Sequence, residues 1–250
     1  IKISENGFIN LTTEYLSTDH TFRPGATFRE KYGDASLNEY NVFINSKIAI
    51  NDHSNFYVFG GYSFRDSESF AFTRSPDSPR NVTEIYPDGF NPLITAQISD
   101  RSISTGFKTK LNGWNIDINN TFGSNNFHYY IKETLNATLE FSSPASFDAG
   151  GHILNQNTTS GNFSKFYKNY LSGINIAFGT EYRIENYKIF AGETGSYAAY
   201  DINGNVVDQN TDLDELVMLN GVVRPGGSQG YPGYSLKNEV DESRSNLALY

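Results

Sequence analysis

The chain has 250 residues, a formal net charge of −9 and no cysteine. The absence of cysteine excludes a disulfide scaffold, a thiolate zinc site and a cysteine nucleophile, and the acidic balance argues against a nucleic-acid partner, which requires a basic stripe. The mean hydropathy of −0.48 is too polar for a helical membrane protein, and no stretch approaches the roughly 20 apolar residues of a spanning helix.

Segments in which polar and apolar residues alternate recur from one end of the chain to the other. Successive side chains of a strand point to opposite faces, so each segment predicts a strand with one apolar and one polar face. In the clearest one, Ile174, Ile176 and Phe178 share one parity, while Glu181 and Arg183 share the other. Eight strands are predicted in chain order, at residues 7–17, 40–50, 56–64, 101–111, 114–122, 158–163, 173–185 and 243–250.

The connections between these strands alternate between short and long. Asn112-Gly113 alone joins the fourth and fifth strands, which is a strong hairpin signal because a type I′ turn needs positive φ at both positions. Three segments, 65–99, 125–157 and 192–240, contain the long connections, and the third strand is expected to end at Arg65-Asp66. Outer-membrane barrels have short periplasmic turns and long extracellular loops. We therefore expect an all-β fold: an antiparallel up-and-down transmembrane β-barrel segment of about eight strands with long extracellular loops.

Short motifs in and around the long segments occur in a fixed order. They are YPDGFNPLI at 86–94, GWNID at 113–117, GSN at 123–125, TLNATL at 134–139, SPASFDAGG at 143–151, FGTEYRIENY at 178–187, GGSQGYPGY at 226–234 and SRSN at 243–246. This series resembles the barrels of bacterial TonB-dependent outer-membrane receptors. The resemblance implies a barrel of about 22 strands around a plug domain, so residues 1–250 are expected to be a partial barrel domain. The signal peptide, the TonB-contacting box, the plug and the remaining strands of that family have no counterpart here.

The resemblance also implies a function, which is import of a scarce nutrient across the bacterial outer membrane. A ferric chelate of the siderophore type is the commonest substrate class of the family, and cobalamin or an oligosaccharide fits these residues almost as well. The implied partners are outer-membrane lipid, the plug domain, the TonB energy-transducing complex acting through the plug, and the small-molecule or oligosaccharide ligand. No catalytic constellation stands out, so we expect neither an enzyme nor a cofactor.

Two other interpretations remain open. A stand-alone eight-stranded outer-membrane barrel would be so narrow that its own side chains fill it, although the inward positions here are rather charged. A soluble all-β carbohydrate-binding or carbohydrate-cleaving domain would instead stack two sheets and enclose Ile174, Ile176 and Phe178 in a dry centre.

Two sets of residues are candidates for binding. Charged residues on the inward parity could contact a plug through charge-assisted hydrogen bonds, or could bond only to water and neighbouring strands; they are Lys47, Asp117, Glu181, Arg183 and Glu185. Loop residues could capture a ligand, because arginines suit anionic oxygens and aromatic faces suit sugars or flat chelates, or could serve loop packing. They are Arg74, Arg80, Tyr86, Asp88, Phe90, His152, Arg224, Gln229, Tyr231 and Tyr234.

A metal site is a weaker possibility. Asp212, Asp214 and Glu215 could supply hard oxygen ligands to Ca²⁺, or could be solvated loop carboxylates. The four histidines are scattered and lack the i, i+4 spacing of a helical metal site, so they are expected to lie in solvated loops.

Overall fold

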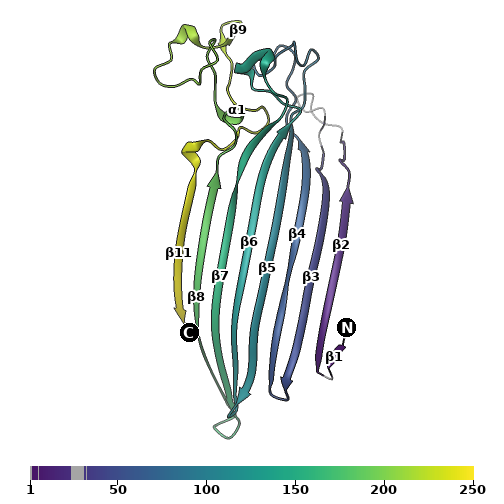
Figure 1. Cartoon of the computed structure of the whole chain (residues 1–250), viewed down its shortest axis with the longest axis vertical. Coiled ribbons are helices and arrows are strands. Elements are labelled where there is room, and N and C mark those ends of the chain that lie inside the picture. Colours follow the sequence, from purple (N-terminus) through teal and green to yellow (C-terminus); the bar gives the residue numbers. More distant parts are fainter. Residues whose placement is uncertain (1, 5, 24–30, 32) are drawn as a thin grey trace.

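The computed structural model describes residues 2–4, 6–23, 31 and 33–250. Its main feature is one antiparallel sheet in which eight long strands follow one another in chain order, with a three-residue strand beside the first (Figure 1). The strands are β1 (Lys2–Ser4), β2 (Gly7–Thr18), β3 (Ser36–Asn51), β4 (Ser54–Phe70), β5 (Leu93–Leu111), β6 (Trp114–Lys132), β7 (Phe147–Tyr167), β8 (Ile174–Phe190) and β11 (Val240–Leu249). The expected all-β, antiparallel up-and-down order is therefore confirmed.

The connections hold only small elements. These are η1 (Ala137–Ser142), α1 (Thr194–Tyr197), η2 (Leu213–Glu215), η3 (Leu236–Asn238) and the pair β9 (Met218–Leu219) and β10 (Val222–Val223). In the described part of the chain, no helix combines the length and the apolarity needed to cross a membrane.

The long sheet is open. Its order runs from β1 and β2 at one edge to β11 at the other, and no pairing joins these edges in the described residues. A barrel closed at eight strands is therefore wrong. The two-sheet alternative is also wrong, because the only other sheet in the described residues is the two-residue pair β9 and β10. Ile174, Ile176 and Phe178 are 37%, 45% and 48% exposed instead of enclosed.

Short turns lie at one end of the sheet and long connections at the other (Figure 1). The turn between β5 and β6 has φ of 50° at Asn112 and 81° at Gly113, as a type I′ turn requires. The long connections are residues 19–35, 71–92, 133–146 and 191–239. We call the side with these connections the loop end.

The strands extend further toward the loop end than the alternation of residues predicts. β4 continues to Phe70 instead of ending at Arg65-Asp66, β5 begins at Leu93 instead of residue 101, and β6 ends at Lys132 instead of residue 122. β7 likewise covers Phe147–Tyr167 instead of 158–163. The expected loop segment 125–157 is thus mostly strand, and the segment 65–99 is strand at both of its ends.

The strands are longer than predicted because their apolar residues change from one face to the other partway along the strand. In β6, Ile116, Ile118 and Phe122 lie on one face, whereas Phe127 and Ile131 lie on the other. The pairing of β6 with β5 continues through this point without a register shift. The backbone of the strand is therefore uninterrupted, and only the chemical character of its two faces is exchanged.

Cross-strand register places most of the exposed apolar side chains of the long strands on one face, whereas Phe43, Phe59 and Leu154 are exposed on the other. We call this surface the apolar belt, and the opposite surface the polar face. The exposed belt residues include Leu11, Tyr15, Tyr40, Val42, Ile44, Ile48, Phe56, Tyr62, Ile103, Phe107, Leu111, Ile118, Ile174, Ile176, Phe178, Tyr182, Ile184, Leu247 and Leu249.

The buried core lies at the loop end. Val82, Phe90, Leu135 and Ala137 pack together within the connections 71–92 and 133–146. These connections therefore form a packed layer with its own dry centre.

The Asn112-Gly113 turn yields a prediction about stability. Replacing Gly113 by alanine should lower the free energy of unfolding by about 1–2 kcal/mol, because a Cβ is unfavourable at positive φ. Gly161 is the matched control: it lies within β7, its φ is not positive, and an added Cβ would make only ordinary contacts at 3.7 and 3.8 Å. Urea unfolding followed by circular dichroism measures both variants. Equal effects of Gly113→Ala and Gly161→Ala would contradict the turn assignment.

Candidate ligand-binding groove

Complementary polar side chains meet across the strands on the polar face. Arg65 of β4 pairs with Asp100 of β5, and the second carboxylate oxygen of Asp100 accepts from Asn125 Nδ2 at 2.7 Å. Glu185 of β8 accepts from Gln156 Nε2 at 3.3 Å. Its other oxygen accepts from Nε of Arg244, a residue of the edge strand β11, at 2.5 Å. Each carboxylate therefore has neighbours for both of its oxygens.

A groove crosses the sheet between these two clusters. One hollow of about 310 Å³ lies over β3 to β7, and another of about 530 Å³ lies over β7, β8 and β11. Leu154 lines both, so the hollows adjoin. We call them together the polar-face groove. Small side chains form the floor of the groove. Six residues that are consecutive cross-strand partners lie along it, namely Gly61, Ser102, Gly123, Gln156, Glu185 and Arg244.

A wall of aromatic rings rises beside the groove toward the loop end. His152 stacks on Phe127 with ring centroids 5.3 Å apart, and its ring is 6.3 Å from Tyr187, which lines the groove. Tyr129 packs on Tyr231 at 4.9 Å. We call the following residues the aromatic wall: Phe127, Tyr129, His152, Tyr187, Tyr231 and Tyr234.

Tyr231 and Tyr234 reach the wall from the long connection 191–239. Their rings meet at 6.2 Å. Burial raises the pKa of Tyr231, and its hydrogen bond to Tyr234 adds to the shift. Tyr231 therefore keeps a neutral hydroxyl, which can donate a hydrogen bond, at physiological pH.

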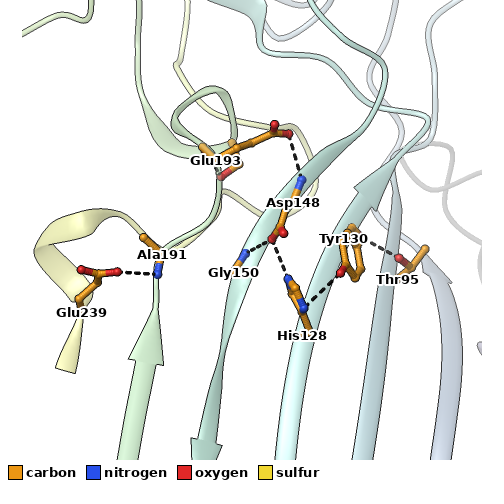
Figure 2. A network of polar contacts seen from close by, with 9 residues as sticks. Thr95, His128, Tyr130, Asp148, Gly150, Ala191, Glu193 and Glu239 are labelled. Atoms are coloured by element: carbon orange, nitrogen blue, oxygen red, sulfur yellow. Dashed lines mark hydrogen bonds and ion pairs between the residues drawn. The ribbon is translucent and has the colours of Figure 1, made fainter. Parts of the chain in front are cut away.

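A polar network ties this connection to the strands (Figure 2). Nε2 of His128 lies 2.8 Å from Oδ1 of Asp148, and the Tyr130 hydroxyl lies 3.1 Å from Nδ1 of the same imidazole. The backbone N–H of Asp148 donates to Oε1 of Glu193 at 3.0 Å. The start of the connection is therefore fixed to β6 and β7.

The far part of the connection is fixed as well. The backbone N–H of Tyr234 donates to the carbonyl of Ala149 at 3.0 Å, and the carbonyl of Tyr234 accepts from the N–H of Gly192 at 2.9 Å. Glu239 accepts from the N–H of Ala191 at 3.3 Å (Figure 2). These contacts position Tyr234 and its neighbour Tyr231 over the sheet.

The charged residues expected to face inward all lie on the polar face, where the described contacts are with other strands of the sheet or with their own strand. Asp117 accepts from the Tyr57 hydroxyl at 2.9 Å, and Glu181 pairs with Arg183 at 2.7 Å. Lys47 lies opposite Tyr57 in the register. Contact of these residues with a plug stays a prediction, and Glu185 alone of the five lines the groove.

The loop candidates divide into two groups. Arg74 and Arg80 both donate to Oε1 of Gln229, at 3.3 and 3.2 Å, and Gln229 is buried. Tyr86 stacks on Phe90 in the buried core, with ring centroids 4.4 Å apart. Arg74, Arg80 and Gln229 therefore hold the connections 71–92 and 191–239 together, whereas Tyr86 and Phe90 pack 71–92 against 133–146.

Arg224 also contributes to loop packing. It is buried and donates to the backbone carbonyls of Asn81 and Pro79. Asp88 is exposed beside the turn at Gly89. Of the ten loop candidates, only His152, Tyr231 and Tyr234 belong to the aromatic wall beside the groove.

Other residues of the groove and of the aromatic wall were not predicted from the sequence. Phe127 and Tyr129 fall in a segment read as loop, because the apolar parity changes there. The charge pairing of Arg65 with Asp100 and of Glu185 with Arg244 joins residues 35 and 59 positions apart. A signal was present in the reversed alternation of Phe127, Tyr129 and Ile131, which by itself predicts a strand with exchanged faces.

The expectations for metal ligands need correction. Asp212 and Glu215 form a capping box at η2, and no group of three or more His, Asp or Glu side chains in the described ranges could hold a metal ion. The calcium site therefore has no support. His128 and His152 lie in strands β6 and β7 instead of solvated loops.

Comparisons with protein-family models, curated proteins and solved structures give no match for this chain. The likeness to TonB-dependent receptors rests on the sequence motifs alone.

The loop contacts give a second prediction. Gln229→Ala removes the shared acceptor of Arg74 and Arg80 and should cost about 1–3 kcal/mol of local stability. Trypsin should then cleave after Arg74 and Arg80 roughly fivefold to a hundredfold faster. The control is Asp88→Ala, which changes an exposed side chain of the same connection and should leave the cleavage rate unchanged. Unchanged cleavage in Gln229→Ala would show that this contact does not hold the two connections together.

Proposed function

We propose that this chain forms part of the wall of an outer-membrane β-barrel that imports a nutrient, with the polar face toward the lumen. The observation that carries the proposal is the exposed apolar belt on one side of a sheet whose other side is a hydrogen-bonded polar surface. A single exposed sheet face covered by Ile, Leu, Val, Phe and Tyr from seven of the eight long strands is far more than a water-soluble surface normally shows. Lipid contact accounts for it.

The height of the belt supports the proposal. In β6 the belt extends from Trp114 to Phe122, which matches the roughly 9–11 residues of a tilted membrane-spanning strand. Beyond this level the faces exchange character. The outer surface then carries polar groups such as Gln97 and His128, while Phe127 and Tyr129 turn inward beneath the connections. That exchange fits strands that leave the lipid and continue into water.

The arrangement of the connections supports an orientation. Short turns are typical of the periplasmic side and long loops of the extracellular side, so the loop end would face the exterior. A ligand arriving there would meet the packed loop layer, then the aromatic wall, and then the groove. A plug domain, and a TonB-type partner acting through it, are proposed from the sequence resemblance.

The open edges of the sheet would need partners in a membrane. Unpaired backbone groups in hydrocarbon cost several kcal/mol each, so the edges at β2 and β11 would have to pair with further strands in the membrane. Transport of a ferric chelate of the siderophore type stays a prediction.

Spin labels test the membrane position. The chain contains no cysteine, so Ile118→Cys and Asn119→Cys give one label on each face at the same depth. In phospholipid vesicles, the label at Ile118 should be accessible to oxygen and protected from a water-soluble nickel chelate. The label at Asn119 should show the reverse preference.

Gln97→Cys is the control for the edge of the belt. It lies on the same side as Ile118 but nearer the loop end, and its label should be accessible to the nickel chelate. If the label at Ile118 is as accessible to the chelate as that at Gln97, or is protected from both reagents, the proposed lipid contact is wrong.

A further inference from the structure

We propose that the polar-face groove binds an uncharged, polyhydroxylated ligand, namely an oligosaccharide. The inference rests on the proposed function, because it names the substrate class that the polar side of the wall would receive. It departs from the ferric chelate expected from the sequence. Four features carry it: the charge of the groove, its hydrogen-bonding groups, the aromatic wall beside it and its shape.

The charge of the groove does not suit an anionic chelate. Its lining includes three carboxylates, Asp100, Glu185 and Glu242, and two guanidinium groups, Arg101 and Arg244. Three negative and two positive groups leave a formal charge of −1. Arg244 is already paired with Glu185, and register directs Arg101 to the apolar side. A negatively charged ligand would therefore find no free guanidinium directed into the groove.

The hydrogen-bonding groups suit hydroxyls. Asn125 and Gln156 use their amide N–H groups on Asp100 and Glu185, which leaves their carbonyl oxygens as acceptors. Ser102 adds a hydroxyl that can donate and accept, and Ser63, whose hydroxyl donates to Glu39 at 3.2 Å, adds an acceptor. Because the carboxylate partners hold both amides in place, the acceptors have fixed directions. Fixed, neutral groups of this kind recognise sugar hydroxyls without requiring a charge.

The aromatic wall supplies the apolar contact that sugars need. A pyranose ring presents a face of C–H groups, which packs on an aromatic ring. Tyr187 is 40% exposed and lines the groove, and His152 lies next to it. Tyr129 lies beside His152, at 6.3 Å between ring centroids, and Tyr231 packs on Tyr129 at 4.9 Å, so the aromatic surface continues toward the loop end.

The shape of the groove suits an oligomer. It extends from β3 to β11, which is six strand spacings or about 29 Å at the usual interval. It is shallow and elongated and has no single deep chamber, because two adjoining hollows of about 310 and 530 Å³ form it. A linear chain of sugar rings can follow such a groove, whereas a compact chelate would contact only part of it.

Gly123 allows the groove to be filled with little disturbance of the sheet. Its φ is not in the left-handed region, and a Cβ there would meet nothing within 4 Å. Gly123→Trp therefore places an indole in the groove. Gly161→Trp is the matched control, because this glycine of β7 lies on the belt side and also has room for a Cβ. Tyr187→Ala tests the aromatic contact separately.

The experiment uses the full chain in detergent micelles and three probes: neutral linear hexasaccharides of glucose or xylose, an anionic ferric tricatecholate, and cyanocobalamin. Saturation-transfer NMR and calorimetry measure binding. We expect a hexasaccharide to bind the parent chain and Gly161→Trp alike. Its affinity should fall at least tenfold in Gly123→Trp and several-fold in Tyr187→Ala. Circular dichroism checks that each variant keeps the strand content of the parent chain.

Three results would overturn the inference: binding of the ferric tricatecholate or cyanocobalamin in place of every saccharide, no binding of any probe, or equal affinity in Gly123→Trp and the parent. Each of these results would rule out an oligosaccharide as the ligand. The membrane proposal would still stand if the label at Ile118 contacts lipid. A water-accessible label at Ile118 would remove the membrane proposal whatever the sugar binding shows.

Discussion

Continuous antiparallel register across eight long strands is the constraint on which the rest of the structure depends. Because the side-chain period of a strand is two, a slip of one residue in any pair would move that strand's apolar residues to the other face. Ladder pairing from β2 to β11 keeps them aligned, apart from local shifts such as the one between His128 and Tyr130. The apolar belt and the polar face are both products of this alignment.

The same register also explains how the groove forms. Small residues from neighbouring strands, Gly61, Ser102 and Gly123, fall in one row and lower the surface there. Long charged side chains on either side pair with each other instead of covering the gap. The aromatic wall follows from the exchange of faces near the loop end, which brings Phe127 and Tyr129 to the same side as the groove.

The loop layer links the fold to the proposed binding site. Gln229 joins the connections 71–92 and 191–239 through Arg74 and Arg80, while Asp148 and Glu193 tie the second connection to the sheet. Tyr231 thereby lies on Tyr129. Residues chosen from the sequence for ligand capture, such as Arg224 and Phe90, mainly support this arrangement, because their side chains are buried among loop atoms.

The sequence by itself determined the strand order, the alternation of short and long connections, and the face on which residues such as Ile118 and Glu181 lie, because hairpin turns and period-two alternation are local properties. Tertiary structure alone decided how far the strands extend, since Phe127 follows the opposite parity from Phe122 and only pairing with β5 shows that the strand continues. It also decided which polar residues meet. Arg244 and Glu185 are distant in the chain, and their contact depends on the long connection 191–239 returning β11 to the edge of β8, which no local pattern encodes.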